Sequence, residues 1–190
     1  MIDLGAGDGR AVLATAASEP STLVIGVDAA AASMAESSRR AARAGRATRG
    51  APSNVLFVVA AAESIPSELV GIAERVRVQL PWGSLLRGCL GLDNRVAAGI
   101  ASLVAPGGEL KLLLAPIERD GLAAVPTDPG EVIRAVAAAF AAFGLVLAEG
   151  RPATAEELGA SHSTWAKRLL SGGSAASRPV TLVRLRSSPR

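Results

Sequence analysis

A glycine-rich turn near the N-terminus is the first group of residues whose types and spacing could do chemistry. It reads Asp3-Leu-Gly5-Ala-Gly7-Asp8-Gly9, between a short apolar stretch and an alanine-rich segment. That context predicts a turn from a buried strand into a helix. Glycines let a backbone bend sharply and approach a ligand closely. We therefore expect a small ligand to lie against this turn.

The acids near the turn discriminate between ligands. The third glycine comes one position too early for the G-x-G-x-x-G pattern of nicotinamide dinucleotides, and Asp8 would face a pyrophosphate. S-adenosylmethionine has no phosphate, and its ammonium and sulfonium suit nearby acids. Asp28 ends the next predicted strand, 20 residues after Asp8, and could accept both ribose hydroxyls. The alternative is that Asp8 and Asp28 are only turn or capping residues.

The two tryptophans of the chain flank the same predicted edge of the sheet. Trp82 follows a predicted strand, and Trp165 lies in a long loop, about 151–179, between the last two predicted strands. Ligands of open α/β sheets bind at the carboxyl ends of the strands. Flipping a base out costs a few kcal/mol, and stacking returns about 1–3 kcal/mol per base. Two indoles would cover that cost, so the pair predicts a base sandwich; the alternative for Trp82 is a core anchor.

Arginine dominates the positive charge of the chain. It supplies all but two of the 20 basic residues, although the net charge is only +3. Five arginines occur within eleven residues that contain no acid, so we expect that no ion pairs relieve their repulsion. We interpret the run as a phosphate-tracking patch rather than a solvated helix face. Its members are Arg39, Arg40, Arg43, Arg46 and Arg49, and Arg168 and Arg178 would add charge beside the opening.

Several classes of protein are excluded by composition. One cysteine, Cys89, and one histidine, His162, exclude both a disulfide framework and a His/Cys zinc cluster, so no metal site is expected. We interpret Cys89 as a buried apolar residue and His162 as loop filler. The longest apolar stretch, 135–148, is too short to span a bilayer. The N-terminus does not have the pattern of a secretory signal, which favours the cytoplasm.

Alternating strands and helices must position these residues. We predict strands at 1–4, 22–27, 55–60, 75–80, 109–115, 145–150 and 180–185, and helices at 10–18, 29–46, 67–74, 92–103 and 131–143. The unbroken β-branched and aromatic run at 55–60 predicts a buried strand. Asp128 and Pro129 are expected to cap and start the last helix. This alternation is typical of one α/β domain over 1–190, with a parallel sheet and an antiparallel closing edge. The first strand begins at the initiator Met, so either the chain is truncated at its N-terminus or the strand starts earlier than assigned.

Three segments resemble a known family. They are Asp3-Leu-Gly-Ala-Gly-Asp-Gly-Arg10, Leu80-Pro-Trp-Gly-Ser-Leu-Leu-Arg87 and Ser163-Thr-Trp-Ala-Lys-Arg-Leu169. Together they resemble the aminoglycoside-resistance 16S rRNA methyltransferases of the kanamycin–apramycin type, which methylate N1 of adenine 1408 with S-adenosylmethionine. The first segment is common among methyltransferases, and the other two are more specific. The resemblance implies a Rossmann-like class I fold, with a seven-stranded, mostly parallel sheet and an antiparallel last strand.

The resemblance also implies roles for individual residues. Trp82 and Trp165 would sandwich the flipped adenine, with Ser163 helping to position it. The residues implied to bind the cofactor are Asp3, Gly5, Gly7, Asp28, Ala62, Glu63 and Ser84. Those implied to dock on rRNA are Arg39, Arg40, Arg43, Lys167, Arg168 and Arg178.

The expected partner is the 30S subunit, through the decoding region of its 16S rRNA. Neither DNA nor a membrane is expected as a partner, and we expect a monomer. Family members carry an extension before the first strand that helps to contact RNA, and the sequence begins without one. Two alternatives stay open: a methyltransferase that acts on a small molecule or protein, and an RNA-binding relative that holds the cofactor but transfers nothing.

Overall fold

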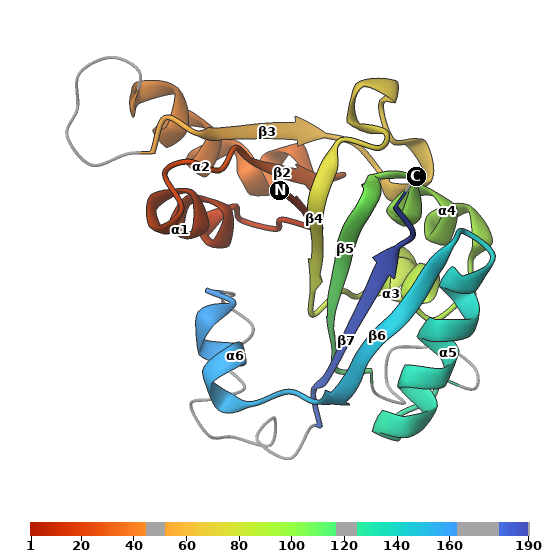
Figure 1. Cartoon of the computed structure of the whole chain (residues 1–190). Helices are drawn as coiled ribbons and strands as arrows, with labels where there is room; N and C mark the ends of the chain where they lie inside the picture. The colour runs from red at the N-terminus through yellow and green to blue at the C-terminus, as the bar shows by residue number, and fades with distance from the viewer. Residues whose placement is uncertain (45–51, 117–124, 163–178, 190) are drawn as a thin grey trace.

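A seven-stranded sheet forms the centre of the molecule (Figure 1). The computed structural model describes residues 1–44, 52–116, 125–162 and 179–189. The strand order is β3-β2-β1-β4-β5-β7-β6, and only β7 runs antiparallel to its neighbours, which confirms the predicted sheet. The strands are β1 (Ile2–Leu4), β2 (Val24–Asp28), β3 (Val55–Val59), β4 (Ala73–Gln79), β5 (Val104–Leu114), β6 (Leu145–Pro152) and β7 (Thr181–Ser187).

In the part of the chain that the structure describes, six helices and two short 3-10 turns connect the strands. The helices are α1 (Arg10–Ser18), α2 (Ala31–Ala44), α3 (Gly83–Cys89), α4 (Asn94–Ser102), α5 (Pro129–Ala141) and α6 (Ala155–Ala160), and the turns are η1 (Ala62–Ser64) and η2 (Ser67–Leu69). The predicted cap of α5 is confirmed, because the Asp128 carboxylate accepts the Glu131 N–H at 3.0 Å and Pro129 begins the helix. Within the described ranges, every helix is too short or too polar to cross a bilayer.

Three sequence-based predictions about these elements are wrong. Residues 67–74 were predicted as a helix, but Gly71, with φ 69°, separates η2 from β4. Helices α3 and α6 were not predicted, because seven and six residues are too few to show a helical apolar period. The strand at 55–60 was predicted as buried, but β3 is an edge strand. Leu56 and Val59 are more than half exposed, because β3 pairs only with β2 among the described strands.

The two faces of the sheet differ in chemistry. Helices α3, α4 and α5 cover one face, where they enclose the largest apolar cluster. On the other face, α1 and α2 pack over the β2–β3 side, and Leu158 of α6 packs on Leu113 and Leu182 of β5 and β7. These two smaller clusters are separate. The space between them along the sheet is occupied by charged side chains.

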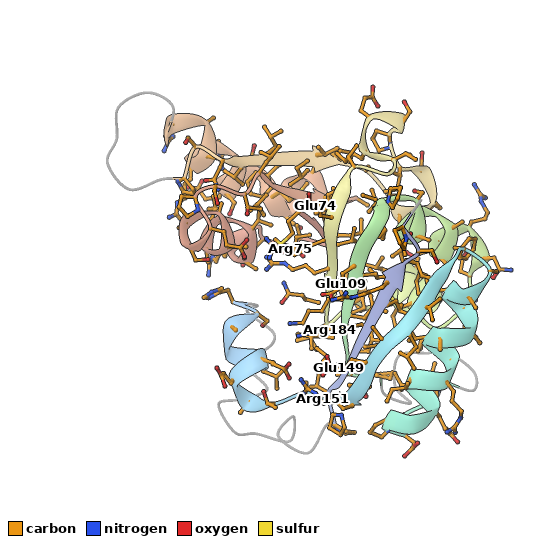
Figure 2. All side chains as sticks on the ribbon, in the orientation of Figure 1. Glu74, Arg75, Glu109, Glu149, Arg151 and Arg184 are labelled. Carbon is orange, nitrogen blue, oxygen red and sulfur yellow. The ribbon has the colours of Figure 1, made fainter. Side chains whose placement is uncertain are left out.

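A row of charged residues crosses the sheet between these clusters. Asp3, Arg77, Lys111, Arg184 and Glu149 occupy paired positions on β1, β4, β5, β7 and β6. Figure 2 shows Arg184 and Glu149, with Arg75 and Glu109, along these strands. The row is anchored at both ends by ion pairs, since Arg77 lies 2.7 Å from the Asp3 carboxylate and Arg184 lies 3.4 Å from that of Glu149. Arg77 thereby fixes the acid at the carboxyl end of β1.

Candidate active site

A cavity of about 480 Å³ opens at the carboxyl ends of β1 to β4. Its volume lies within the range of roughly 300–1,000 Å³ that is usual for small-molecule sites. Every residue predicted to bind the cofactor lines it, together with one of the two tryptophans. These residues are Asp3, Gly5, Gly7, Asp28, Ala62, Glu63, Ser84 and Trp82. The parallel strands bring them together although they are up to 81 positions apart in the chain.

Two glycines of the turn allow a close approach of neighbouring elements. Gly5 has φ 77°, and a Cβ there would lie 2.6 Å from the Leu85 side chain of α3. Gly9 has φ 73°, and a Cβ there would lie 2.7 Å from the ring of Phe57. The turn is also tied to α2, because the Ser37 hydroxyl donates to the Asp8 carbonyl at 2.6 Å. The turn is therefore held by packing from α3, β3 and α2.

Asp28 holds the turn and also faces the cavity. Its carboxylate accepts the Gly7 N–H at 2.8 Å through one oxygen and the Ala30 N–H at 2.8 Å through the other. These two bonds are the ones expected if Asp28 serves as a turn or capping residue. A carboxylate has about four acceptor positions, so two remain for ligand hydroxyls at a residue that lines the cavity. The structural and ligand-binding roles are compatible.

The charged groups that line the cavity are mainly acids. Asp3 is buried, and burial raises the pKa of its carboxyl while the Arg77 guanidinium opposes that rise. Asp8 is exposed and accepts the Arg10 N–H at 3.1 Å. Glu63 is exposed on η1, after β3. With Asp28, they make a lining that repels phosphate and suits a cationic ligand, as the ammonium and sulfonium of S-adenosylmethionine require.

Trp82 stands at the rim of the cavity. Its side chain is 79% exposed, so the alternative of a core anchor is wrong. It occupies the N-cap position of α3, two residues after Leu80. Leu80 has φ 49°, and its side chain packs beside Leu113 and Leu158. That left-handed residue turns the chain at the end of β4 and leaves the indole in solvent.

Among the described residues, positive φ angles outside glycine occur only at the cavity. Leu80 and His162 are the two such residues in the described part of the chain, and both line it. Such conformations cost roughly 1–3 kcal/mol and are concentrated at functional sites. Patterns in the sequence assign no ligand-binding role to His162, and they also miss Gln79 and Pro81. The positions of Gln79 and Pro81 beside Trp82 could have indicated them, but a single loop histidine gives no periodic signal.

Part of the predicted site lies outside the described residues. The predicted site residues outside the described part of the chain are Ser163, Trp165, Lys167, Arg168 and Arg178. The described chain reaches residue 162 at the lining of the cavity.

The predicted basic patch is described only for its first half. Arg39, Arg40 and Arg43 are exposed on α2, and Arg46 and Arg49 lie outside the described residues. The expectation that no acid relieves the patch is wrong for Arg39, because Glu36, one turn earlier, lies 3.1 Å from its guanidinium. Arg40 is ten residues beyond Ala30 of the cavity wall, or about 15 Å along a helix. The patch is therefore separate from the cavity but on an element that starts there.

The sheet order, the reversed β7 and the glycine turn define a class I methyltransferase, and similar solved structures are enzymes of this class. One is a mutant of the 16S rRNA (adenine(1408)-N(1))-methyltransferase from Catenulisporales acidiphilia with cosubstrate SAM. It is 31% identical, with a TM-score of 0.84 over 98% of this chain and 84% of that chain. The aminoglycoside resistance methyltransferase NpmB1 is 37% identical, with a TM-score of 0.77 over 98% and 85%.

Sequence comparison gives the family. The family model described as NpmA: 16S rRNA (adenine(1408)-N(1))-methyltransferase matches residues 1–183. The enzyme of that name from Streptoalloteichus hindustanus is 34% identical over 175 residues, which cover 89% of this chain and 79% of the relative. The chain belongs to the 16S rRNA (adenine(1408)-N(1))-methyltransferase family.

Proposed function

We propose that this protein transfers a methyl group from S-adenosylmethionine to N1 of adenine 1408 in 16S rRNA, and so confers aminoglycoside resistance. Its substrate is the decoding region of the 30S subunit, and it acts in the cytoplasm as a monomer. The observation that carries the proposal is an exposed indole, Trp82, at the rim of an acid-lined cavity in a chain of this family.

The cofactor residues divide along the cavity in strand order. Asp28, the last residue of β2, binds the ribose hydroxyls, and Ala62 and Glu63, after β3, lie on the adenine side. Asp3, within β1, is on the methionine side, where a carboxylate favours the ammonium. Gly5 and Gly7 allow the ligand to approach the backbone of the turn, and Ser84 closes the cavity from the first turn of α3.

When bound, the cofactor supplies an electrophilic methyl group on a sulfonium to the lone pair of adenine N1. That nitrogen is unprotonated at neutral pH, so the protein needs no general base. Its residues act by binding and alignment, which can supply a large part of the rate enhancement. The methylated base is a cation without an acceptor at N1, which weakens the binding of polycationic aminoglycosides.

The base is held by stacking between Trp82 and Trp165, and Ser163 helps to position it. Loss of one stacking face removes about 1–3 kcal/mol, so we expect Trp165→Ala to lower methyl transfer roughly 10- to 100-fold. Cofactor affinity should stay unchanged, because that ring stacks on the base. Trp165→Phe, which keeps an aromatic face, is the matched control and should keep most activity.

Two measurements on the same variants test this role. Calorimetry gives the affinity for S-adenosylmethionine, and primer extension across the decoding site of treated 30S subunits reports N1-methyladenine as a stop. An equal loss of affinity and transfer in Trp165→Ala would contradict stacking. A wild-type chain that methylates another substrate, and leaves no stop at this adenine, would contradict the proposed function.

Arg39, Arg40 and Arg43 dock the enzyme on the rRNA backbone, with Lys167, Arg168 and Arg178. Each phosphate contact releases counterions, so Arg40→Ala should lower the slope of log affinity against log salt by about one. Arg134→Ala is the control, since Arg134 is an exposed arginine on α5, which covers the opposite face of the sheet. Filter binding to 30S subunits between low and moderate salt measures both slopes. Equal slopes for the two variants would remove Arg40 from the docking surface.

A further inference from the structure

We infer that His162 binds the methionine carboxylate of the cofactor and so selects S-adenosylmethionine over ligands that lack that group. The inference rests on the proposed function, because it assigns one end of the same ligand. It gives a role to a residue for which the sequence offered none.

The charge balance of the cavity leaves the ligand carboxylate without an obvious partner. S-adenosylmethionine carries two positive groups, which the acids favour, and one carboxylate, which they repel. His162 is the only residue, among the described ones that line the cavity, whose side chain can carry a positive charge. Arg77 lies behind this wall and is already bound to Asp3 at 2.7 Å and to the Ala11 carbonyl at 3.3 Å.

Most backbone N–H groups of the glycine turn are already hydrogen-bonded within the protein. In phosphate-binding turns, unpaired N–H groups point at the ligand. Here the N–H groups of five turn residues already donate within the protein, two to the Val27 carbonyl and the others to Asp28, Ala6 and Asp8. The five donors are Gly5, Ala6, Gly7, Gly9 and Arg10. The turn therefore leaves few donors for the carboxylate, which favours a donor from a side chain outside the turn.

His162 is placed on the methionine side of the cavity by a fixed set of contacts. When the Gln79 amide is assigned the orientation that satisfies both of its neighbours, its oxygen accepts the Arg77 Nε–H at 3.0 Å and its nitrogen donates to the Ser161 carbonyl at 3.1 Å. The end of β4 is thereby bonded to the residue before His162. Since Arg77 also binds Asp3, the links run from the floor of the cavity to His162. In the proposed placement of the cofactor, the ribose lies at β2 and the adenine towards β3. Because β1 and β4 follow β2 in the sheet, the methionine end then extends towards these two strands.

Helix α6 keeps His162 at this position. Thr154 and Glu157 form a reciprocal capping box at the start of the helix, and Arg151 binds the Glu157 carboxylate with two bonds of 2.8 and 2.7 Å. Leu158 packs into an apolar cluster with Leu80. The helix ends in a left-handed His162 with φ 53°. Histidine adopts this conformation more readily than bulky or β-branched residues. The position that needs a left-handed backbone can therefore also carry the imidazole.

A matched pair of ligands isolates the carboxylate. Decarboxylated S-adenosylmethionine keeps the adenosine, the sulfonium and the ammonium and lacks only the carboxylate. We expect the wild-type protein to bind S-adenosylmethionine about tenfold more tightly than this compound, which is the size expected for one partly exposed hydrogen bond to a charged group. His162→Ala should weaken S-adenosylmethionine about tenfold and leave the decarboxylated compound unchanged.

Three further variants separate the side chain from the backbone and from the fold. His162→Asn keeps an N–H donor and the left-handed preference, and it should keep most of the discrimination. His162→Gly relieves the backbone but removes the donor, so it should lose the discrimination while raising the unfolding temperature. Glu63→Gln, on the adenosine side, should change both affinities by the same factor.

Calorimetry without ribosomes measures the affinities of these four variants and of Ser84→Ala for both ligands, ten values beside the two of the wild type. Equal weakening of both ligands in His162→Ala, or no change in either, would overturn the inference. Loss of discrimination on Ser84→Ala with none on His162→Ala would assign the carboxylate to the hydroxyl instead. A wild-type protein that binds neither ligand would contradict the proposed cofactor itself, and this result is recognised before any variant is made.

Discussion

Gly99 of α4 is the position where an added methyl group would reveal how tightly the cavity wall is packed. A Cβ at Gly99 would lie 1.6 Å from the Ala62 carbonyl oxygen of η1. Real Cβ contacts essentially never fall below 3.0 Å, so Gly99→Ala must separate α4 and η1 by at least about 1.4 Å. The oxygen belongs to the backbone and cannot rotate away. Ala97 and Ile100, which lie beside Gly99 on α4, are fully buried, so the helix has no room to move away from η1.

The expected cost follows from overpacking. Forced insertion into a packed core costs about 1–3 kcal/mol, and we take the upper end because both partners are held. Alanine is better than glycine in a helix by about 0.5–1 kcal/mol, which leaves a net loss near 2 kcal/mol. For a chain of this length that corresponds to a fall of roughly 4–8 °C in the unfolding temperature. Because Ala62 and Glu63 line the cavity, cofactor affinity should also fall.

Gly159 of α6 provides the matched control. It is also a helical glycine, but a Cβ there would meet nothing within 4 Å. Gly159→Ala should therefore stabilise the protein by about 0.5 kcal/mol and leave cofactor affinity unchanged. Urea denaturation and calorimetry measure both effects. If Gly99→Ala is as stable as Gly159→Ala and binds the cofactor normally, the close contact between α4 and η1 does not exist.

Three other perturbations test the packing and charge of the fold. Burial raises the pKa of the Cys89 thiol to about 12. A disulfide reagent at pH 8 should therefore label this thiol only after the protein unfolds. Rapid labelling of the native protein would contradict the burial of Cys89. Arg151 holds the pKa of Glu157 at about 2, below its usual 4.5, so this carboxylate stabilises the fold above about pH 4.5 and loses that contribution as the pH falls towards 2. Glu157→Gln should therefore flatten the dependence of urea stability on pH in that range, and an unchanged slope would count against the ion pair. Asp28→Asn should cost about 1–2 kcal/mol, because an amide cannot accept both N–H groups that the carboxylate accepts; wild-type stability in urea would show that these bonds are dispensable.

Local patterns in the sequence predicted the elements that depend on neighbouring residues. The glycine turn, the acid at the end of β2 and the capped start of α5 are each set by a few adjacent residues whose backbone preferences agree. The predictions failed where the outcome depends on what packs alongside. The same apolar run that would suit a central strand forms the exposed edge strand β3. The acid that pairs with Arg39 was overlooked because it precedes the basic run by one helical turn.

The sequence by itself determined the class of the protein, since the order of strands and helices, the turn and the tryptophan segments are all readable along the chain. Only the tertiary structure decided how the cavity is completed. The Asp3–Arg77 pair joins residues 74 positions apart, and the bond from Gln79 to Ser161 joins residues 82 positions apart. Such contacts leave no local pattern, because each partner has an ordinary environment in sequence and meets the other only when the sheet forms. His162 is a candidate ligand-binding residue only because the folded chain brings it to the lining of the cavity.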